Sequence, residues 1–204
     1  MIFHVYPAGV FQANCYIIAD ENTLEGAVVD PGGDPEGILG ICKKLNLNVK
    51  YIILTHGHGD HIAGVWKIKQ ETGAKILMNS KDEYLTDGGT KELIPILRDI
   101  RLFDIDEYIN EGDVINLGNI RIEVLETPGH TLGSVSLKMG NIVLTGDALF
   151  QGSVGRTDFP KSSHEELIRS IKEKILTLPD DTVVYPGHGP STTVGDEKRY
   201  NPFL

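Results

Sequence analysis

The feature that most constrains this fold is an apolar run that leads directly into a cluster of polar, ligand-type side chains. The run VKYIILT (49–55) is apolar without alternation, which is typical of a strand covered on both faces of its sheet. We therefore expect a central strand here. The chain continues as THGHGDH, which places three histidines and an aspartate between positions 55 and 61. Loops that follow rigid strands are where a scaffold presents functional side chains.

Strand-like and helix-like segments alternate along both halves of the chain. Branched and aromatic runs bounded by turn residues, or alternation of apolar and polar residues, predict strands over 15–20, 26–30, 74–79, 118–127, 134–139, 141–147 and 182–189. Apolar residues at helical spacing predict helices over 35–45, 61–73, 89–99 and 163–178. No linker, low-complexity segment or clear repeat divides the chain, so we predict a single domain over 1–204 in the α/β class.

Local signals indicate where several of these elements begin, break or end. Gly73 is suited to a left-handed cap on the second predicted helix, and Pro95 is expected to break the third. Ser163, with Glu166 three residues later, forms the start signature of the fourth helix. The Gly-Asn pair at 140–141 predicts a tight hairpin between two of the strands.

Composition excludes several classes of function. The formal charge of -10 and the pI of about 5.1 argue against a nucleic-acid partner, which requires a clustered basic surface. No run approaches the roughly 18 apolar residues of a membrane span, and the N-terminus has no export signal. Cys15 and Cys42 show no metal-binding or redox spacing and lie in apolar segments. We expect reduced thiols and a cytoplasmic location.

Further ligand-type residues occur in glycine-containing loops that follow other predicted strands. They are His130 in TPGHT, Asp147 in TGDALF and His188 in PGHGPS. A single histidine in such a loop is as often a capping or solvent-facing group as a ligand, but the joint pattern strongly favours a site. His4 and His164, near the terminus and in a helix's first turn, keep the ordinary surface interpretation.

The ligand types indicate which cofactor the loops hold. Imidazole and carboxylate without a usable cysteine suit zinc, iron or manganese rather than calcium or an iron–sulfur cluster. Five histidines and two aspartates in these loops exceed one tetrahedral shell. They suffice for two ions about 3.5–4 Å apart that share a carboxylate and a water, an arrangement that generates hydroxide near neutral pH. Hydrolysis is the natural chemistry. Nucleotide binding is excluded because neither a GxGxxG fingerprint nor a phosphate loop is present.

The motifs THGHGDH, TPGHT, TGDALFQGSVGRTDFP and YPGHGPST, in this order and spacing, resemble the metallo-β-lactamase superfamily. They are most similar to its glyoxalase II-like branch of hydroxyacylglutathione hydrolases, in the short bacterial type. The resemblance covers nearly the whole chain and implies a four-layer αββα sandwich of two mixed sheets with a metal site at one edge. It also implies seven ligands, with Asp147 as the bridge: His56, His58 and His130 for one ion, and Asp60, His61 and His188 for the other.

The same resemblance implies an activity. We expect hydrolysis of small thioesters such as S-lactoylglutathione by a metal-bridging hydroxide, with Asp60 and Asp147 as catalytic groups and two divalent ions, most simply zinc, with iron or manganese as alternatives. Asp30 in VVDPGG falls where the superfamily often has a buried acid behind the ligands, although an Asx turn before proline explains it equally well. The expected partner is a small-molecule thioester, with no nucleic acid or membrane; the oligomeric state is left open.

The chain departs from full-length glyoxalase II enzymes in two places. It ends about sixteen residues after His188, so we expect the helical glutathione-holding domain to be absent. Arg156 stands where the family has a basic substrate contact, but Asp158 replaces the tyrosine expected two positions later. Arg156 is therefore either a substrate-binding residue or a partner of Asp158 that fixes the loop beneath Asp147.

Other activities of this superfamily remain open alternatives. The GRTDF stretch (155–159) also occurs in persulfide dioxygenases, whose single iron would be held by the positions matching His56, His130 and Asp147. A lactonase, a β-lactamase or a metal-binding protein without catalysis are further possibilities. The seven ligands do not separate a hydrolase from a dioxygenase.

Overall fold

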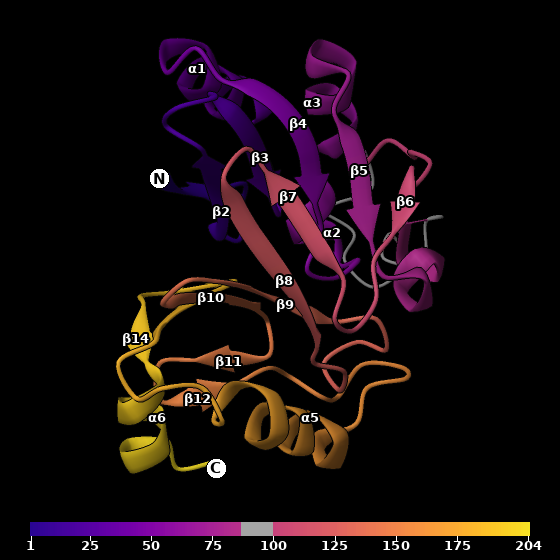
Figure 1. The fold of residues 1–204 in the computed structure, drawn as a ribbon. Coiled ribbons are helices and arrows are strands. Elements are labelled where there is room, and N and C mark those ends of the chain that lie inside the picture. The colour runs from indigo at the N-terminus through magenta and orange to yellow at the C-terminus, as the bar shows by residue number, and fades with distance from the viewer. Residues whose placement is uncertain (87–99) are drawn as a thin grey trace.

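Residues 1–86 and 100–204 are described by the computed structural model of the chain. The helix predicted over 89–99 lies outside these described residues. Most of the described strands form two six-stranded sheets, and two short strands, β11 (Leu149–Phe150) and β12 (Ser153–Val154), pair separately. Figure 1 shows most of the strands in the middle of the molecule, with α1 (Pro35–Lys44) and α3 (Val65–Thr72) at one end and α5 (His164–Ser170) and α6 (Val194–Tyr200) at the other.

The first sheet is mixed, and the predicted central strand lies inside it. Its order follows the chain: β1 (Ile2–Ala8), β2 (Ala13–Ala19), β3 (Glu25–Val29), β4 (Asn48–Ile53), β5 (Lys75–Met78) and β6 (Glu107–Tyr108). Strands β1 to β3 pair antiparallel, whereas β3 to β6 pair in parallel. Because β4 lies between two parallel neighbours, the prediction of a central strand is confirmed.

The second sheet is also mixed, and its order does not follow the chain. From edge to edge it runs β14 (Thr192–Thr193), β13 (Val183–Pro186), β10 (Ile142–Gly146), β9 (Val135–Met139), β8 (Ile120–Glu126) and β7 (Val114–Leu117). Only β10 and β13 pair in parallel. Gly140, with φ of 56°, makes the tight turn between β9 and β10, as the Gly-Asn pair predicts.

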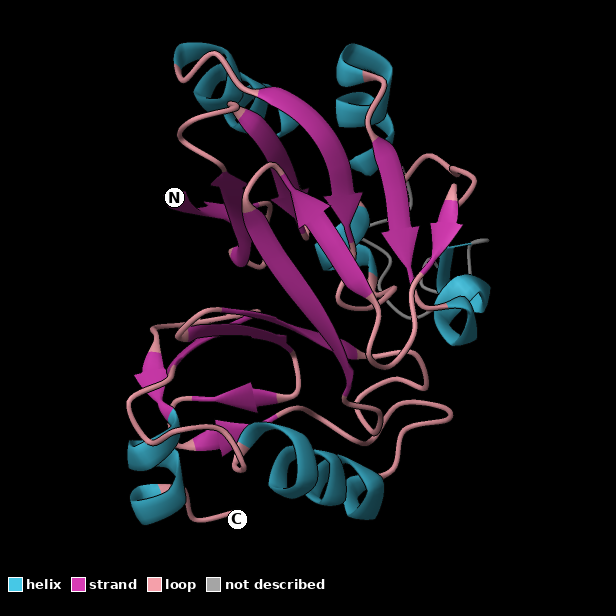
Figure 2. Ribbon diagram, viewed as in Figure 1, coloured by secondary structure: helices cyan, strands magenta, loops and turns pink. Residues whose placement is uncertain are grey.

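The helices are shown in cyan in Figure 2: α1, α3, α5 and α6 lie outside the strands, whereas α2 lies near the end of β4. The described ones are α1 (Pro35–Lys44), α2 (Gly59–Ile62), α3 (Val65–Thr72), η1 (Ser80–Asp82), α5 (His164–Ser170), the π-helical turn η4 (Ile171–Ile175) and α6 (Val194–Tyr200). Two predicted caps are confirmed: Gly73 ends α3 with φ of 69°, and the Ser163 side chain accepts a hydrogen bond from the Glu166 N–H.

One segment that was predicted as a single helix forms two helices. The segment expected as a single helix over 61–73 is divided between α2 and α3, with Gly64 between them. The Gly64 N–H donates to the Pro31 carbonyl at 2.8 Å, and a Cβ atom at Gly64 would lie 2.9 Å from that same oxygen. Contact with the loop after β3 therefore breaks a helix that apolar periodicity alone continues.

Three separate apolar layers establish a four-layer αββα sandwich. On one face of the first sheet, α1 and α3 cover residues such as Ile17 and Ile52, whereas their neighbours Ile18 and Ile53 face the second sheet. The outer face of the second sheet packs through Val143 and others against α5 and η4. Alternate residues of a strand point to opposite faces, so one fully buried strand supplies two cores. The predicted fold class is confirmed.

The topology brings the polar loops to one edge of the sandwich. Strands β3 and β4 are parallel, so the loops after them start from the same edge of the first sheet. Strands β10 and β13 are parallel, and β8 runs in their direction because it is antiparallel to β9, which is antiparallel to β10. The loops after these five strands carry all the candidate ligands. Among the described residues, no helix is long and apolar enough to cross a membrane.

Candidate metal centre

The seven candidate ligands form two clusters, and each cluster draws on both sheets. The first consists of His56 and His58, from the loop after β4, and His130, from the loop after β8. The His58 Nδ1 and His130 Nε2 atoms lie 2.9 Å apart, and all three side chains are buried. This arrangement matches the ligand set that the resemblance assigned to one ion.

The second cluster consists of Asp60 and His61, on α2, and His188, from the loop after β13. The His61 Nε2 lies 3.2 Å from the His188 Nε2, which lies 3.4 Å from an Asp60 carboxylate oxygen. His61 is fully buried, whereas the side chain of His188 is 27% exposed and that of Asp60 is 17% exposed. The second cluster is therefore the more open of the two.

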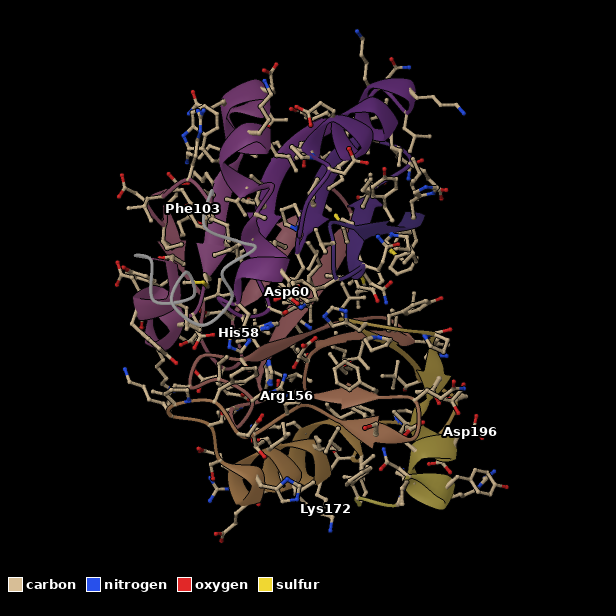
Figure 3. All side chains as sticks on the ribbon, turned by 180° about the vertical axis from the view of Figure 1, so that it is seen from behind. His58, Asp60, Phe103, Arg156, Lys172 and Asp196 are labelled. Carbon is tan, nitrogen blue, oxygen red and sulfur yellow. The ribbon has the colours of Figure 1, made fainter. Side chains whose placement is uncertain are left out.

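Asp147, which follows β10, lies between the clusters. Its Oδ1 is 3.4 Å from His61 Nε2, and its Oδ2 is 3.6 Å from His130 Nε2 and 3.8 Å from His188 Nε2. A carboxylate that reaches histidines of both clusters has the placement a bridging ligand requires. Figure 3 shows the labelled His58 and Asp60 at the junction of the two halves of the molecule, with Arg156 coming from the half that contains the second sheet.

The ring nitrogens on the far side of the ligands are held by other groups. His130 Nδ1 contacts the Arg156 carbonyl at 2.7 Å, and His61 Nδ1 contacts the Asp30 carboxylate at 3.1 Å. His56 Nδ1 lies 3.1 Å from the Thr55 hydroxyl. Such contacts fix the orientation of the imidazole and leave the opposite nitrogen for a metal ion.

Asp30 lies behind the candidate ligands, where its oxygens are already engaged in hydrogen bonds. It lies within ligand distance of His56 and His61, but its oxygens already accept hydrogen bonds from the Thr55 N–H at 2.8 Å and the Thr55 hydroxyl at 2.6 Å. Its backbone is left-handed, with φ of 50°, a conformation that aspartate tolerates better than most residues. The supporting role of the Thr55 hydroxyl, inside the opening motif, was not anticipated from the sequence.

Burial and nearby charges shift the pKa values of the candidate ligands. Burial, with nearby imidazoles, holds the pKa of His56 well below its ordinary value and lowers that of His58 to about 3. Burial also opposes the charge on His61, but Asp147 outweighs it and raises the pKa of His61 well above the ordinary value. Burial likewise opposes ionisation of Asp147, yet His61 and His56 hold its pKa well below the ordinary range. Neutral imidazoles and ionised carboxylates are the metal-binding forms, so His56, His58 and Asp147 already have the form that binds a metal ion, whereas His61 releases a proton on binding.

Two buried atoms of the centre fit a bound cation. His56 Nε2 and Asp147 Oδ1 are buried and have no hydrogen-bond partner among the described residues. A buried polar atom left unpaired costs about 1–3 kcal/mol, and coordination to a cation would satisfy both atoms. The nitrogen pairs of the two clusters, 2.9 and 3.2 Å apart, are close to the roughly 3.3 Å implied by tetrahedral Zn–N bonds of about 2.0–2.1 Å. The residues present therefore fit the implied metal ions.

The mouth of the first cluster is formed by the loop after β12. The Arg156 guanidinium donates from Nε and Nη2 to Asp158 at 3.0 and 2.8 Å and lies over the Phe159 ring, 4.5 Å from its centroid. The Phe159 ring centroid is 5.1 Å from that of His58. The ion pair that was one of the two expectations for Arg156 is thus formed. Phe159 was missed as a wall of the site because a single phenylalanine in a loop has no distinguishing pattern.

Comparisons with known proteins identify relatives that share almost the full length of the chain. A model of the metallo-beta-lactamase superfamily matches residues 8–188. The hydroxyacylglutathione hydrolase GloC of Haemophilus influenzae is 40% identical over 209 residues, which cover 100% of this chain and 98% of that protein. The similarity therefore includes every loop that carries a candidate ligand.

Solved structures with the same architecture include proteins of more than one description. The B3 metallo-beta-lactamase BLEG-1 superposes with a TM-score of 0.93 at 35% identity, covering 100% of this chain and 99% of that one. The protein TTHA1623, crystallised in a di-iron-bound form, has a TM-score of 0.89 at 32% identity, with coverage of 98% and 100%. The same architecture thus occurs in a protein described as a metallo-beta-lactamase and in a protein that binds two irons.

Proposed function

The chain belongs to the metallo-beta-lactamase superfamily, and on this premise we propose that it hydrolyses small thioesters such as S-lactoylglutathione. The observation that carries the proposal is the convergence of all seven ligand-type side chains, five histidines and two aspartates, at one edge of the sandwich. The 40% identity to a hydroxyacylglutathione hydrolase over the whole chain supports this substrate class over others in the superfamily.

We propose that the two clusters hold two divalent ions with Asp147 between them. The first cluster would hold one ion and the second cluster the other, and the di-iron form of TTHA1623 supports this number. Zinc is the simplest assignment for imidazole and carboxylate ligands, with iron or manganese as alternatives. When bound, such ions lower the pKa of a water molecule and polarise a carbonyl group.

The chain's own groups then orient the reactants. Burial opposes ionisation of Asp60, but its hydrogen bond with His188 lowers its pKa, so its carboxylate can accept a hydrogen bond from the attacking water molecule and direct it at the thioester carbonyl. Cys15 and Cys42 are packed in the core between the helices and the first sheet, so neither serves as nucleophile. The departing thiolate needs little acid assistance because thiols are far more acidic than alcohols.

Arg156 is the proposed contact for a carboxylate of the thiol carrier. Two of its N–H groups bond to Asp158, and the others remain for charge-assisted hydrogen bonds to the substrate. The exposed position of Arg156 beside Phe159 allows a flexible carrier to reach it. The ion pair with Asp158 then serves to hold the guanidinium at the mouth of the first cluster.

The direct test is thioester hydrolysis by the purified protein loaded separately with zinc, manganese or iron. We expect release of free thiol from S-lactoylglutathione, measured with a thiol reagent, together with two ions per chain and no consumption of oxygen. A fully metalated protein that releases no thiol from a panel of acyl-thiol esters contradicts the proposal. Oxygen uptake with a persulfide substrate and one iron per chain would instead establish the dioxygenase alternative.

A further inference from the structure

Asp82 is a buried carboxylate outside the ligand set that joins the two loops of the first cluster. It lies in η1, directly after β5, and its side chain is not exposed to solvent. Oδ2 accepts hydrogen bonds from the Gly57 N–H at 3.1 Å and the Thr131 hydroxyl at 2.6 Å, and Oδ1 accepts from the Gly133 N–H at 2.6 Å. All of its donors therefore belong to loops that carry ligands.

The residues that donate to Asp82 are neighbours, in the chain, of the three histidines of the first cluster. Gly57 lies between His56 and His58 in the chain, and Thr131 follows His130 directly. One loop leaves the first sheet at β4 and the other leaves the second sheet at β8. Among the described residues no strand pairing joins the two sheets at this point, and the two loops share one backbone hydrogen bond, from the Val135 N–H to the Thr55 carbonyl at 2.8 Å. The Asp82 carboxylate adds three more hydrogen bonds from residues beside the ligands and so ties the two loops together at the ligands themselves.

Both ligand loops lie close against η1 and the residues that follow it. A Cβ atom at Gly133 would lie 2.8 Å from the Asp82 Cγ, and one at Gly57 would lie 2.8 Å from the Leu85 Cβ. Glycine at both positions allows the backbones to approach the carboxylate closely enough for their N–H groups to bond to it. The contact is therefore a specific docking of two loops on one side chain.

The second cluster is held by different groups. The loop that carries His188 is fixed by Asn14, whose amide donates to the Pro186 carbonyl at 3.0 Å and the Gly189 carbonyl at 2.9 Å. His61 is oriented by Asp30. Removing the Asp82 carboxylate therefore leaves the hydrogen bonds behind the second cluster intact.

We propose that Asp82 is the positioning residue of the first cluster, setting the separation of His56 and His58 from His130 for a metal ion. The inference rests on the proposed metal centre but not on its substrate. Asp82→Asn retains the size of the side chain but replaces one acceptor oxygen with a donor, which then faces an N–H or hydroxyl donor of a ligand loop. Loss of a group that orients ligands from behind typically lowers metal affinity about 10–100-fold.

A matched control is available in the same chain. Glu197 is also a buried carboxylate with three donors, accepting hydrogen bonds from the Gly152 N–H, the Thr192 hydroxyl and the Asn201 amide. None of these three residues is a ligand or a neighbour of one. Glu197→Gln therefore removes a comparable buried acceptor, with a comparable cost in stability, away from the metal centre.

The experiment isolates the first cluster in a His188→Ala background, where the second cluster lacks a ligand. Apo proteins with and without Asp82→Asn or Glu197→Gln are titrated with Co(II) against a competing chelator, and the visible absorption of the bound ion is recorded. We expect Asp82→Asn to weaken binding at least about tenfold and to alter the absorption bands, whereas Glu197→Gln leaves both unchanged. An affinity within twofold of the parent, or an equal loss in Glu197→Gln, overturns the proposal.

A milder variant covers the case in which Asp82→Asn does not fold. Thr131→Val removes the hydroxyl that donates to Asp82 and also contacts the Ser134 hydroxyl, and it keeps the shape of the side chain. A several-fold loss of Co(II) affinity is expected, and no loss overturns the proposal. If the protein binds both ions but cleaves no thioester, the proposed function is wrong, but the comparison of Co(II) affinities between the variants and their parent still tests the role of Asp82. Full turnover with an unaltered metal site in Asp82→Asn contradicts only the role of Asp82.

Discussion

The two halves of the metal centre differ in what holds them. In the first cluster, the three histidines are buried and are supported by neutral groups, such as the Thr55 hydroxyl and the Arg156 carbonyl. In the second, His188 is 27% exposed and contacts Asp60, and His61 contacts Asp30. The ring nitrogens behind the first cluster thus contact neutral groups, whereas both histidines of the second cluster contact carboxylates, and His188 is partly open to solvent.

The largest expected effect tests the group that joins the two halves. Asp147→Ala removes the carboxylate that lies within 3.8 Å of His61, His130 and His188, so we expect loss of metal at both positions and turnover at background level. Metal content by elemental analysis and thiol release measure the two effects. Asp180→Ala, which changes an exposed aspartate paired with Lys198 and with none of the candidate ligands, serves as the control. Equal retention of both ions in Asp147→Ala would remove Asp147 from the bridging position.

A smaller effect should separate the halves from each other. His188→Ala removes one ligand of the open cluster, so we expect the metal content to fall from about two ions per chain to about one, with the remaining ion in the buried cluster. Turnover should fall by more than the roughly 10–100-fold typical of losing a group behind a ligand. If both ions leave, or if the ion that remains is bound by Asp60 and His61, the two clusters do not differ in the way that their burial indicates.

The smallest effect concerns substrate binding at the mouth. Arg156→Ala is expected to raise KM several-fold while kcat remains nearly unchanged, because a contact to the carrier contributes equally to the ground and transition states. Initial rates over a range of S-lactoylglutathione concentrations measure both constants. The alternative hypothesis is that Arg156 binds no substrate and serves only to form the ion pair with Asp158. A fall in kcat or in metal content with KM unchanged would show that Arg156 only fixes the loop beneath Asp147.

Local patterns predicted most of the elements, and the failures share a cause. The helix over Pro35–Lys44 and the strand β4 were expected because their periodicity and boundary residues lie within a short window. Strand β1, half-exposed at the edge of its sheet, and the short helix α6 were missed because neither has a clear apolar pattern. The division of the helix expected over 61–73 was missed because its cause, the Pro31 carbonyl, lies far away in sequence.

The sequence by itself determined the kinds of ligand, since His56, His58, Asp60 and His61 lie within six residues and the motifs around the remaining ligands are short. Which ligands face one another was decided by the tertiary structure. His58 meets His130 across 72 positions of the chain, and His61 meets His188 across 127. Contacts over such separations depend on how the two sheets pack. Asp82 illustrates this dependence: its neighbours in sequence give no sign of a site, and only the folded chain places it between two ligand loops.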